Sequence, residues 1–174
     1  MTDQLPILSH IPDIREALLT HKKAVVAAAP GAGKTTLVPL KLLGEPYLEG
    51  KTILMLEPRR LAARMAAMRM ADLLGEAPGK TVGYQIRHER VAGPSTRIIV
   101  MTEGILTRKI QNDPELSEVG LVIFDEFHER NLHSDLGLAF CLEAADVLRP
   151  DLRILVMSAT LDTAAVAGLL GDAG

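Results

Sequence analysis

Short apolar runs alternate with longer helical patterns along almost the whole chain, and this alternation constrains the fold more than any other feature. The runs are typical of buried strands, and they occupy residues 24–29, 51–58, 81–87, 97–101, 120–126 and 153–160. Strands that alternate with helices form a mainly parallel sheet with helices on both faces. We therefore expect a single α/β domain over residues 1–174.

The first of these runs leads into a glycine-rich loop, "PGAGKTT", and then into a helix that we expect to begin at Lys34. The P-loop pattern G-x-x-x-x-G-K-[ST] fits this segment, except that Ala28 stands at its first glycine. Gly31 and Gly33 let backbone N–H groups turn toward a phosphate, and the positive end of the helix faces the same anion. Lys34 is expected to reach the β- and γ-phosphates of a nucleotide, and the Thr35 hydroxyl to bind Mg²⁺.

A second polar cluster follows the apolar run "LVIF" and reads "DEFHER". Ligands of open parallel sheets bind beyond the carboxyl ends of the strands, where this cluster lies. We expect Asp125 to hold the Mg²⁺ shell, and Glu126 to orient the attacking water and accept its proton. A zinc site of the H-E-x-x-H type is disfavoured, because His133 follows His128 by five residues and would lie roughly 140° away around a helix.

Charge is distributed unevenly along the chain. The net charge is −3, yet residues 58–110 contain ten Lys and Arg against four acids, a net charge of +6. A basic middle segment in an acidic chain can form one positive face that binds a polyanion. The alternative, a set of scattered solvated arginines, stays open on composition alone.

The composition is that of an ordinary globular protein, with 48% hydrophobic and 24% charged residues. No membrane span or signal peptide is recognisable, so we expect a soluble, cytoplasmic protein without membrane partners. The single cysteine, Cys141, lies in an apolar helical stretch and is expected in the core. The methionines at positions 65, 68 and 70 are also expected to fill the core.

Five motifs occur in a fixed order: "AAPGAGKTT", "EPRRLAA", "TEGIL", "DEFHER" and "SAT". In this order and spacing they resemble motifs I, Ia, Ib, II and III of the DEAH-type superfamily 2 RNA helicases. The likeness is greatest to the bacterial HrpB-type members, which have phenylalanine where others have alanine in motif II. The resemblance covers residues 5–161 and implies a RecA-like P-loop NTPase domain.

The resemblance also implies a role for each matching residue. ATP, or another NTP, and Mg²⁺ would be bound by Gly31, Ala32, Gly33, Lys34, Thr35 and Thr36, with Asp125 and Glu126 as the catalytic carboxylates near the metal. His128, Ser158 and Thr160 would couple the nucleotide to a second domain and to nucleic acid. Arg59, Arg60 and Thr102 would contact the sugar-phosphate backbone of single-stranded RNA or DNA.

Two features depart from the family pattern. Phe127 replaces the usual alanine, and strand alternation points it away from Glu126 and His128, so we expect it to pack in the core. The motifs of the second RecA-like domain, including its arginine fingers, do not occur in this sequence. We therefore expect the first half of a two-domain motor.

Two other functions were compared with this prediction. A signalling GTPase shares the P-loop, but it should also contain an N-K-x-D motif, which this sequence lacks. A non-catalytic, nucleotide-gated RNA-binding module stays open as the alternative, because a single domain can bind nucleotide without turnover. The presence of Glu126, a candidate general base, favours the enzyme.

Overall fold

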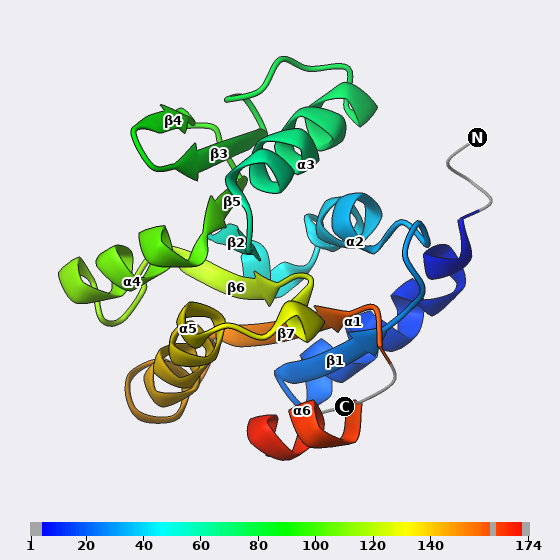
Figure 1. The fold of residues 1–174 in the computed structure, drawn as a ribbon, viewed down its shortest axis with the longest axis vertical. Coiled ribbons are helices and arrows are strands. Elements are labelled where there is room, and N and C mark those ends of the chain that lie inside the picture. The colour runs from blue at the N-terminus through cyan, green and yellow to red at the C-terminus, as the bar shows by residue number, and fades with distance from the viewer. Residues whose placement is uncertain (1–4, 161–162, 172–174) are drawn as a thin grey trace.

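A seven-stranded sheet forms the centre of the computed structural model, which describes residues 5–160 and 163–171 (Figure 1). The spatial order of the strands is β1-β7-β6-β2-β5-β3-β4. Their bounds are β1 (Lys23–Ala27), β2 (Thr52–Glu57), β3 (Val82–Ile86), β4 (Glu89–Val91), β5 (Ile98–Thr102), β6 (Val119–Phe124) and β7 (Arg153–Ser158). Neighbouring strands pair in parallel except β3 and β4. The predicted mainly parallel sheet is confirmed.

Helices cover both faces of the sheet. They are α1 (Ile11–Thr20), α2 (Lys34–Leu42), α3 (Arg60–Leu73), α4 (Glu103–Asn112), α5 (Leu132–Glu143) and α6 (Thr163–Leu170). Ile53 and Met55 of β2 pack with α1, α2 and α3 in one core layer, while Leu54 and Leu56 pack with α4, α5 and α6 in the other. Successive strand residues point to opposite faces, so one strand supplies both layers. No helix in the described ranges is long and apolar enough to cross a membrane.

Residues 5–160 and 163–171 also contain four short helical segments: the 3₁₀ turns η2 (Pro6–His10), η3 (Pro46–Leu48) and η4 (Phe127–Glu129), and the π-helical turn η5 (Ala144–Leu148). The turn η4 follows β6 after Asp125 and Glu126, and it contains the central residues of the acidic motif. It lies at the carboxyl end of the sheet, as do the P-loop after β1 and the residues at the ends of β2, β5 and β7. All five motifs therefore meet along one edge of the sheet.

Strand β4 was not predicted, because residues 89–91 read Glu-Arg-Val and contain no apolar run. It pairs with β3 through a hairpin whose turn residue His88 has a left-handed φ of 66°. The turn has no glycine or asparagine, the residues that usually signal such a hairpin. A short, charged strand of this kind is typical of a sheet edge.

The prediction for the methionines was wrong in part. Met70 is fully buried, but Met65 and Met68 are 56% and 43% exposed. Helix α3 faces the sheet mainly with alanines, which allow a close approach and leave the two methionines on its outer side. Cys141 is fully buried, as predicted, and burial raises the pKa of its thiol to about 12.

Candidate nucleotide and nucleic-acid sites

The P-loop connects β1 to α2 through two glycines in the left-handed region, Gly31 (φ 79°) and Gly33 (φ 94°). At Gly33 a Cβ atom would also lie 3.0 to 3.2 Å from three apolar side chains, so both the backbone conformation and the close packing favour glycine there. Ala28 has no such requirement, because its N–H continues the pairing with β7 by donating to the Ser158 carbonyl at 3.1 Å. This explains how alanine replaces the first glycine of the pattern.

Lys34 begins α2, as predicted, and it is almost completely buried. Its ammonium group donates to the carbonyls of Ala28 and Ala29, at 2.5 and 3.1 Å, and so closes the loop around itself. A cavity of about 310 Å³ lies beside it, lined by Leu5, Pro30, Gly31, Gly33, Lys34, Thr35, Thr36, Arg69, Leu73 and Glu126. The structure thus brings most of the predicted phosphate-binding residues and Glu126 to one cavity.

Asp125 follows β6 directly and is 3% exposed. One carboxylate oxygen accepts a 2.5 Å hydrogen bond from the Thr35 hydroxyl, and the other accepts from the Glu126 N–H at 2.8 Å. Within residues 5–160 and 163–171, Asp125 forms no ion pair with a basic side chain. A buried carboxylate with a hydroxyl neighbour and no cationic partner is suited to Mg²⁺, which prefers oxygen ligands.

Glu57, at the end of β2, was given no role from the sequence. It is 2% exposed. Burial, followed by the charge of Asp125 and a hydrogen bond with that side chain, raises the pKa of Glu57 to about 9. Glu57 therefore stays protonated at neutral pH beside Asp125. The only sequence feature that marks Glu57 is its position in the "EPRR" motif at the end of a strand. That feature does not indicate that Asp125, 68 residues later, lies beside it.

Glu126 has a left-handed backbone conformation, with φ 52°. Such a conformation is unfavourable for glutamate and is characteristic of functional turns. Its carboxylate lies 3.0 Å from Nε2 of His128, and Nδ1 of His128 accepts a 3.1 Å hydrogen bond from the Ala159 N–H. The acceptor role of Nδ1 leaves the imidazole proton on Nε2, facing Glu126. His128 therefore links the acidic motif to the "SAT" segment.

Ser158 and Thr160 flank this contact. Ser158 is buried at the end of β7, and its hydroxyl lies 3.2 Å from both the hydroxyl and the N–H of Thr160. The two predicted coupling residues thus contact each other, and the backbone between them contacts His128. Their action on a second domain stays a prediction.

Phe127 packs in the core, as predicted. It is 2% exposed and meets Phe124 edge to face, with ring centroids 6.3 Å apart. The guanidinium of Arg130 lies over its outer side, 5.2 Å from the ring centroid. Phe127 therefore anchors the turn that carries Glu126 and His128.

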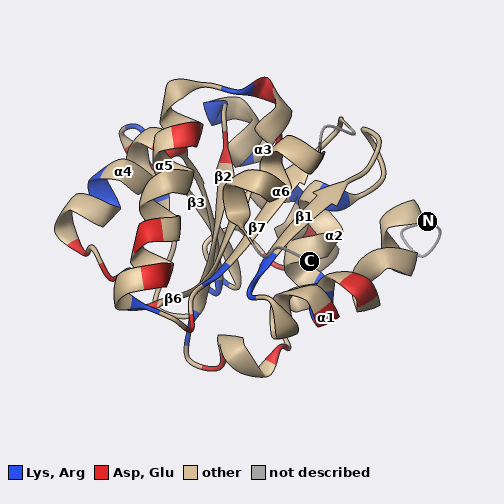
Figure 2. Ribbon diagram, turned by 90° about the horizontal axis from the view of Figure 1, so that it is seen from below, with Lys and Arg blue, Asp and Glu red and all other residues tan. Residues whose placement is uncertain are grey.

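A second cavity, of about 810 Å³, lies at the carboxyl ends of β2 and β5, and we call it the basic groove. It is lined by Pro58, Arg59, Arg60, Arg87, Thr102, Glu103, Gly104, Ile105, Arg108 and His133. The structure brings together the three residues predicted to bind a nucleic-acid backbone, namely Arg59, Arg60 and Thr102. It adds Arg87 from the β3–β4 hairpin and Arg108 from α4. Figure 2 shows the Lys and Arg positions of α4 in blue and the Asp and Glu positions of the neighbouring helix α5 in red.

The other arginines of the basic segment do not all face this groove. Arg97 donates to the carbonyls of Leu48 and Lys51, so its role is structural. Arg64 forms an ion pair with Glu89 at 2.6 Å. Arg69 lines the P-loop cavity instead. The sequence did not predict this position, because it does not show which face of the helix packs on the sheet.

Glu126, His128 and Glu129 place three potential metal-binding atoms within 4.8 Å of one another. Those atoms already have protein partners. His128 uses both ring nitrogens, and Glu129 forms an ion pair with Arg59 at 2.7 Å. The group is therefore better described as a hydrogen-bonded network than as a metal centre.

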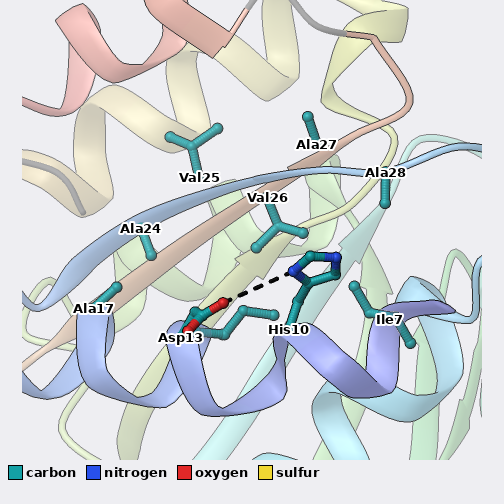
Figure 3. Close-up of a pocket in the computed structure, with 10 residues that line it drawn as sticks. Ile7, His10, Asp13, Ala17, Ala24, Val25, Val26, Ala27 and Ala28 are labelled. Carbon is teal, nitrogen blue, oxygen red and sulfur yellow. Dashed lines mark ion pairs between the residues drawn. The ribbon is translucent and has the colours of Figure 1, made fainter.

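An apolar slot of about 220 Å³ separates α1 from β1 at the edge of the sheet (Figure 3). Its lining residues are mostly alanine, valine and isoleucine. The only ion pair drawn there joins His10 to Asp13 at 3.8 Å, and both side chains are largely exposed. The slot lacks the converging polar groups that the P-loop cavity has.

The fold, the P-loop and the acidic turn together define a RecA-like α/β domain. The family model described as "DEAD/DEAH box helicase" matches residues 12–167, and the chain belongs to this family.

The chain is similar to the ATP-dependent RNA helicase HrpB of Escherichia coli (strain K12), with 53% identity over 169 residues. That match covers 97% of this chain and 21% of the relative. The ATP-dependent RNA helicase HrpA of the same organism is 40% identical over 164 residues, 92% of this chain and 12% of that protein. A crystal structure of the E. coli DEAH/RHA helicase HrpB superposes with a TM-score of 0.93 and 51% identity, covering 98% of this chain and 22% of that one. The chain thus spans about a fifth of the length of HrpB.

Proposed function

We propose that this domain binds ATP with Mg²⁺ and hydrolyses it as part of a motor that moves on single-stranded RNA. The observation that carries the proposal is the hydrogen bond between Thr35 and Asp125, which joins the P-loop to the acidic turn beside one cavity. The relatives HrpB and HrpA, both named ATP-dependent RNA helicases, support it. Other nucleoside triphosphates and single-stranded DNA have the same phosphate chemistry and serve as comparison ligands.

In this proposal Lys34 and the N–H groups of the loop bind the β- and γ-phosphates. Thr35, Asp125 and Glu126 would hold Mg²⁺, directly or through its water shell, and their oxygen atoms fit that ion. Bound Mg²⁺ would neutralise charge that develops on the phosphate oxygens. Glu126 orients the attacking water and accepts its proton, while His128 fixes the direction of the Glu126 carboxylate.

The proposal includes a second RecA-like domain in the parent protein, which would supply the arginine fingers. A finger of this kind accelerates hydrolysis by roughly 10³ to 10⁵ in related P-loop enzymes. We therefore expect the present chain to bind nucleotide but to hydrolyse it at least ~10³-fold more slowly than a chain with both domains. It should not unwind duplexes, because no second domain can close against it.

Calorimetric titration of the chain with Mg-ATP tests nucleotide binding, with Lys34→Ala as the matched variant. The Lys34 ammonium lies inside the loop, next to the Ala28 carbonyl, so its loss should abolish or severely weaken binding. Unchanged affinity would show that the P-loop is not the nucleotide site. Steady-state ATP turnover of the two-domain chain, measured with and without oligouridylate, then tests stimulation by RNA. Comparable turnover by the present chain would contradict the proposal that the second domain supplies the arginine fingers.

A further inference from the structure

Arg59 belongs to two parts of the structure at once. It lines the basic groove beside Arg60 and Thr102. Its guanidinium nitrogen Nη2 also lies 2.7 Å from Oε1 of Glu129, a residue 70 positions later in the chain. The ion pair therefore joins the groove to the acidic turn.

Glu129 lies in the same turn as the residues of the nucleotide site. Its backbone N–H donates to the Glu126 carbonyl at 2.9 Å. His128, the residue before it, contacts the Glu126 carboxylate and the Ala159 N–H. Glu129 is thus the member of the turn that faces the groove, while Glu126 faces the cavity of the P-loop.

We propose that Glu129 is a positioning residue that forms an ion pair with Arg59 until a phosphate of single-stranded RNA replaces Glu129 as the partner of Arg59. This inference rests on the proposed RNA-binding role of the groove. A carboxylate and a phosphodiester accept the same N–H groups of a guanidinium fork, so the two anions compete for Arg59. Binding of RNA then frees the Glu129 carboxylate next to Glu126 and His128.

The exposure of the pair suits such an exchange. The side chain of Arg59 is 69% exposed and that of Glu129 is 33% exposed. Ion pairs between exposed side chains contribute little stability, because water screens the charges and both side chains lose conformational entropy. A phosphate that arrives with neighbouring contacts to Arg60 and Thr102 can replace a partner held this weakly. Among the described residues, Arg60 forms no ion pair and is available to the same phosphate backbone.

Glu129 should therefore lower the affinity for RNA only when Arg59 is present. We would measure the affinity of a fluorescein-labelled oligouridylate for four forms of this chain: unsubstituted, Glu129→Gln, Arg59→Ala and the double variant. Glu129→Gln should tighten binding roughly two- to fivefold when Arg59 is present, the range set by an exposed ion pair. In the Arg59→Ala background the same substitution should leave the affinity unchanged.

Glu143→Gln serves as the matched control, because it removes an equal charge from an exposed position on α5. It should not reproduce the effect of Glu129→Gln. If Glu129→Gln tightens RNA binding equally with and without Arg59, the inference is overturned, because the loss of a negative charge would then act on the RNA directly. Unchanged or weaker RNA binding of Glu129→Gln when Arg59 is present would also overturn it. If Arg59→Ala alone binds as tightly as the unsubstituted chain, the proposed RNA groove fails instead, and the two failures are distinguishable.

Circular dichroism of each form checks that the fold is retained. Glu129 is partly exposed and lies at the surface end of its turn, so replacement by the similarly sized glutamine should not unfold it. Arg59 precedes α3 and is exposed as well. The Arg59 dependence is the readout that a purely structural role of Glu129 would not produce.

Discussion

The Thr35 hydroxyl donates a 2.5 Å hydrogen bond to the Asp125 carboxylate, although the two residues are 90 positions apart. Thr35 lies in the first turn of α2, and Asp125 follows the last residue of β6. The contact places a buried carboxylate next to the hydroxyl of Thr35, a residue that lines the P-loop cavity. Oxygen atoms of these two types are the ligands that Mg²⁺ prefers.

Replacing Thr35 with valine should test this contact with little change of shape. Valine has no hydroxyl, so it can neither donate to Asp125 nor bind Mg²⁺. We expect Thr35→Val to weaken Mg-ATP binding by about tenfold or more, the size of one charge-assisted hydrogen bond. Thr35→Ser keeps the hydroxyl and should retain near-normal affinity. Calorimetry with and without Mg²⁺ measures both, and an equal loss in the two buffers would argue against a metal role.

Glu126→Gln should separate nucleotide binding from turnover in the two-domain protein. The amide oxygen can still accept the hydrogen bond from Nε2 of His128, so the side chain should keep its position. An amide cannot accept the proton of the attacking water. We expect unchanged Mg-ATP affinity and a loss of steady-state hydrolysis of roughly 10² or more. Hydrolysis near the normal rate would assign the general base to another group.

Glu57 should make the stability of the chain depend on pH. Its pKa is raised from 4.5 to about 9, so between these values the folded chain holds a proton that the unfolded chain releases. Stability is therefore lost as pH rises through this window. Glu57→Gln should raise the melting temperature at roughly pH 8, and the gain should shrink toward roughly pH 5.

Thermal unfolding followed by circular dichroism, in buffer without Mg²⁺ or nucleotide, measures this difference. Glu118→Gln, at an exposed position, provides the control and should change little at any pH. A gain at Glu57 that is the same at both ends of the range would mean that packing, and not ionisation, is responsible.

Phe127→Ala should destabilise the domain through a cavity behind the acidic turn. The ring is buried against Phe124, and truncation of a buried phenylalanine to alanine costs about 3–5 kcal/mol. Phe127→Leu should cost less, because more of the volume remains. Urea denaturation measures both values. A loss below about 1 kcal/mol for the alanine variant would show that the turn does not depend on this anchor.

The strands other than β4 and the start of the P-loop helix could be predicted, because each depends on a local pattern. The roles of the site residues stay predictions. Lys34 begins its helix where the glycine loop requires, and Asp125 follows an apolar run that can only be a buried strand. The carboxyl ends of parallel strands share one edge, so the sequence also indicated that these residues meet.

The missed features depend on contacts between distant segments. Nothing near Arg59 in the sequence indicates that its partner is Glu129, and nothing near Glu57 indicates a protonated carboxyl beside Asp125. The orientation of α3 about its own axis decides that Arg69 lines the P-loop cavity and that Met65 is exposed to solvent. Such rotations follow from the packing of the whole helix and cannot be read from one residue.

Strand β7 lies between β1 and β6 and acts as a spacer in the sheet. The strand that leads to the P-loop and the strand that leads to Asp125 are consequently two inter-strand distances apart, about 9.5 Å. Adjacent strands would press the loop against the acidic turn, whereas this width leaves room for a phosphate group between them. The spacer also ends in the "SAT" segment, which contacts both sides through Ala28 and His128. The same strand therefore sets the width of the opening and is hydrogen-bonded to the segments on both of its sides.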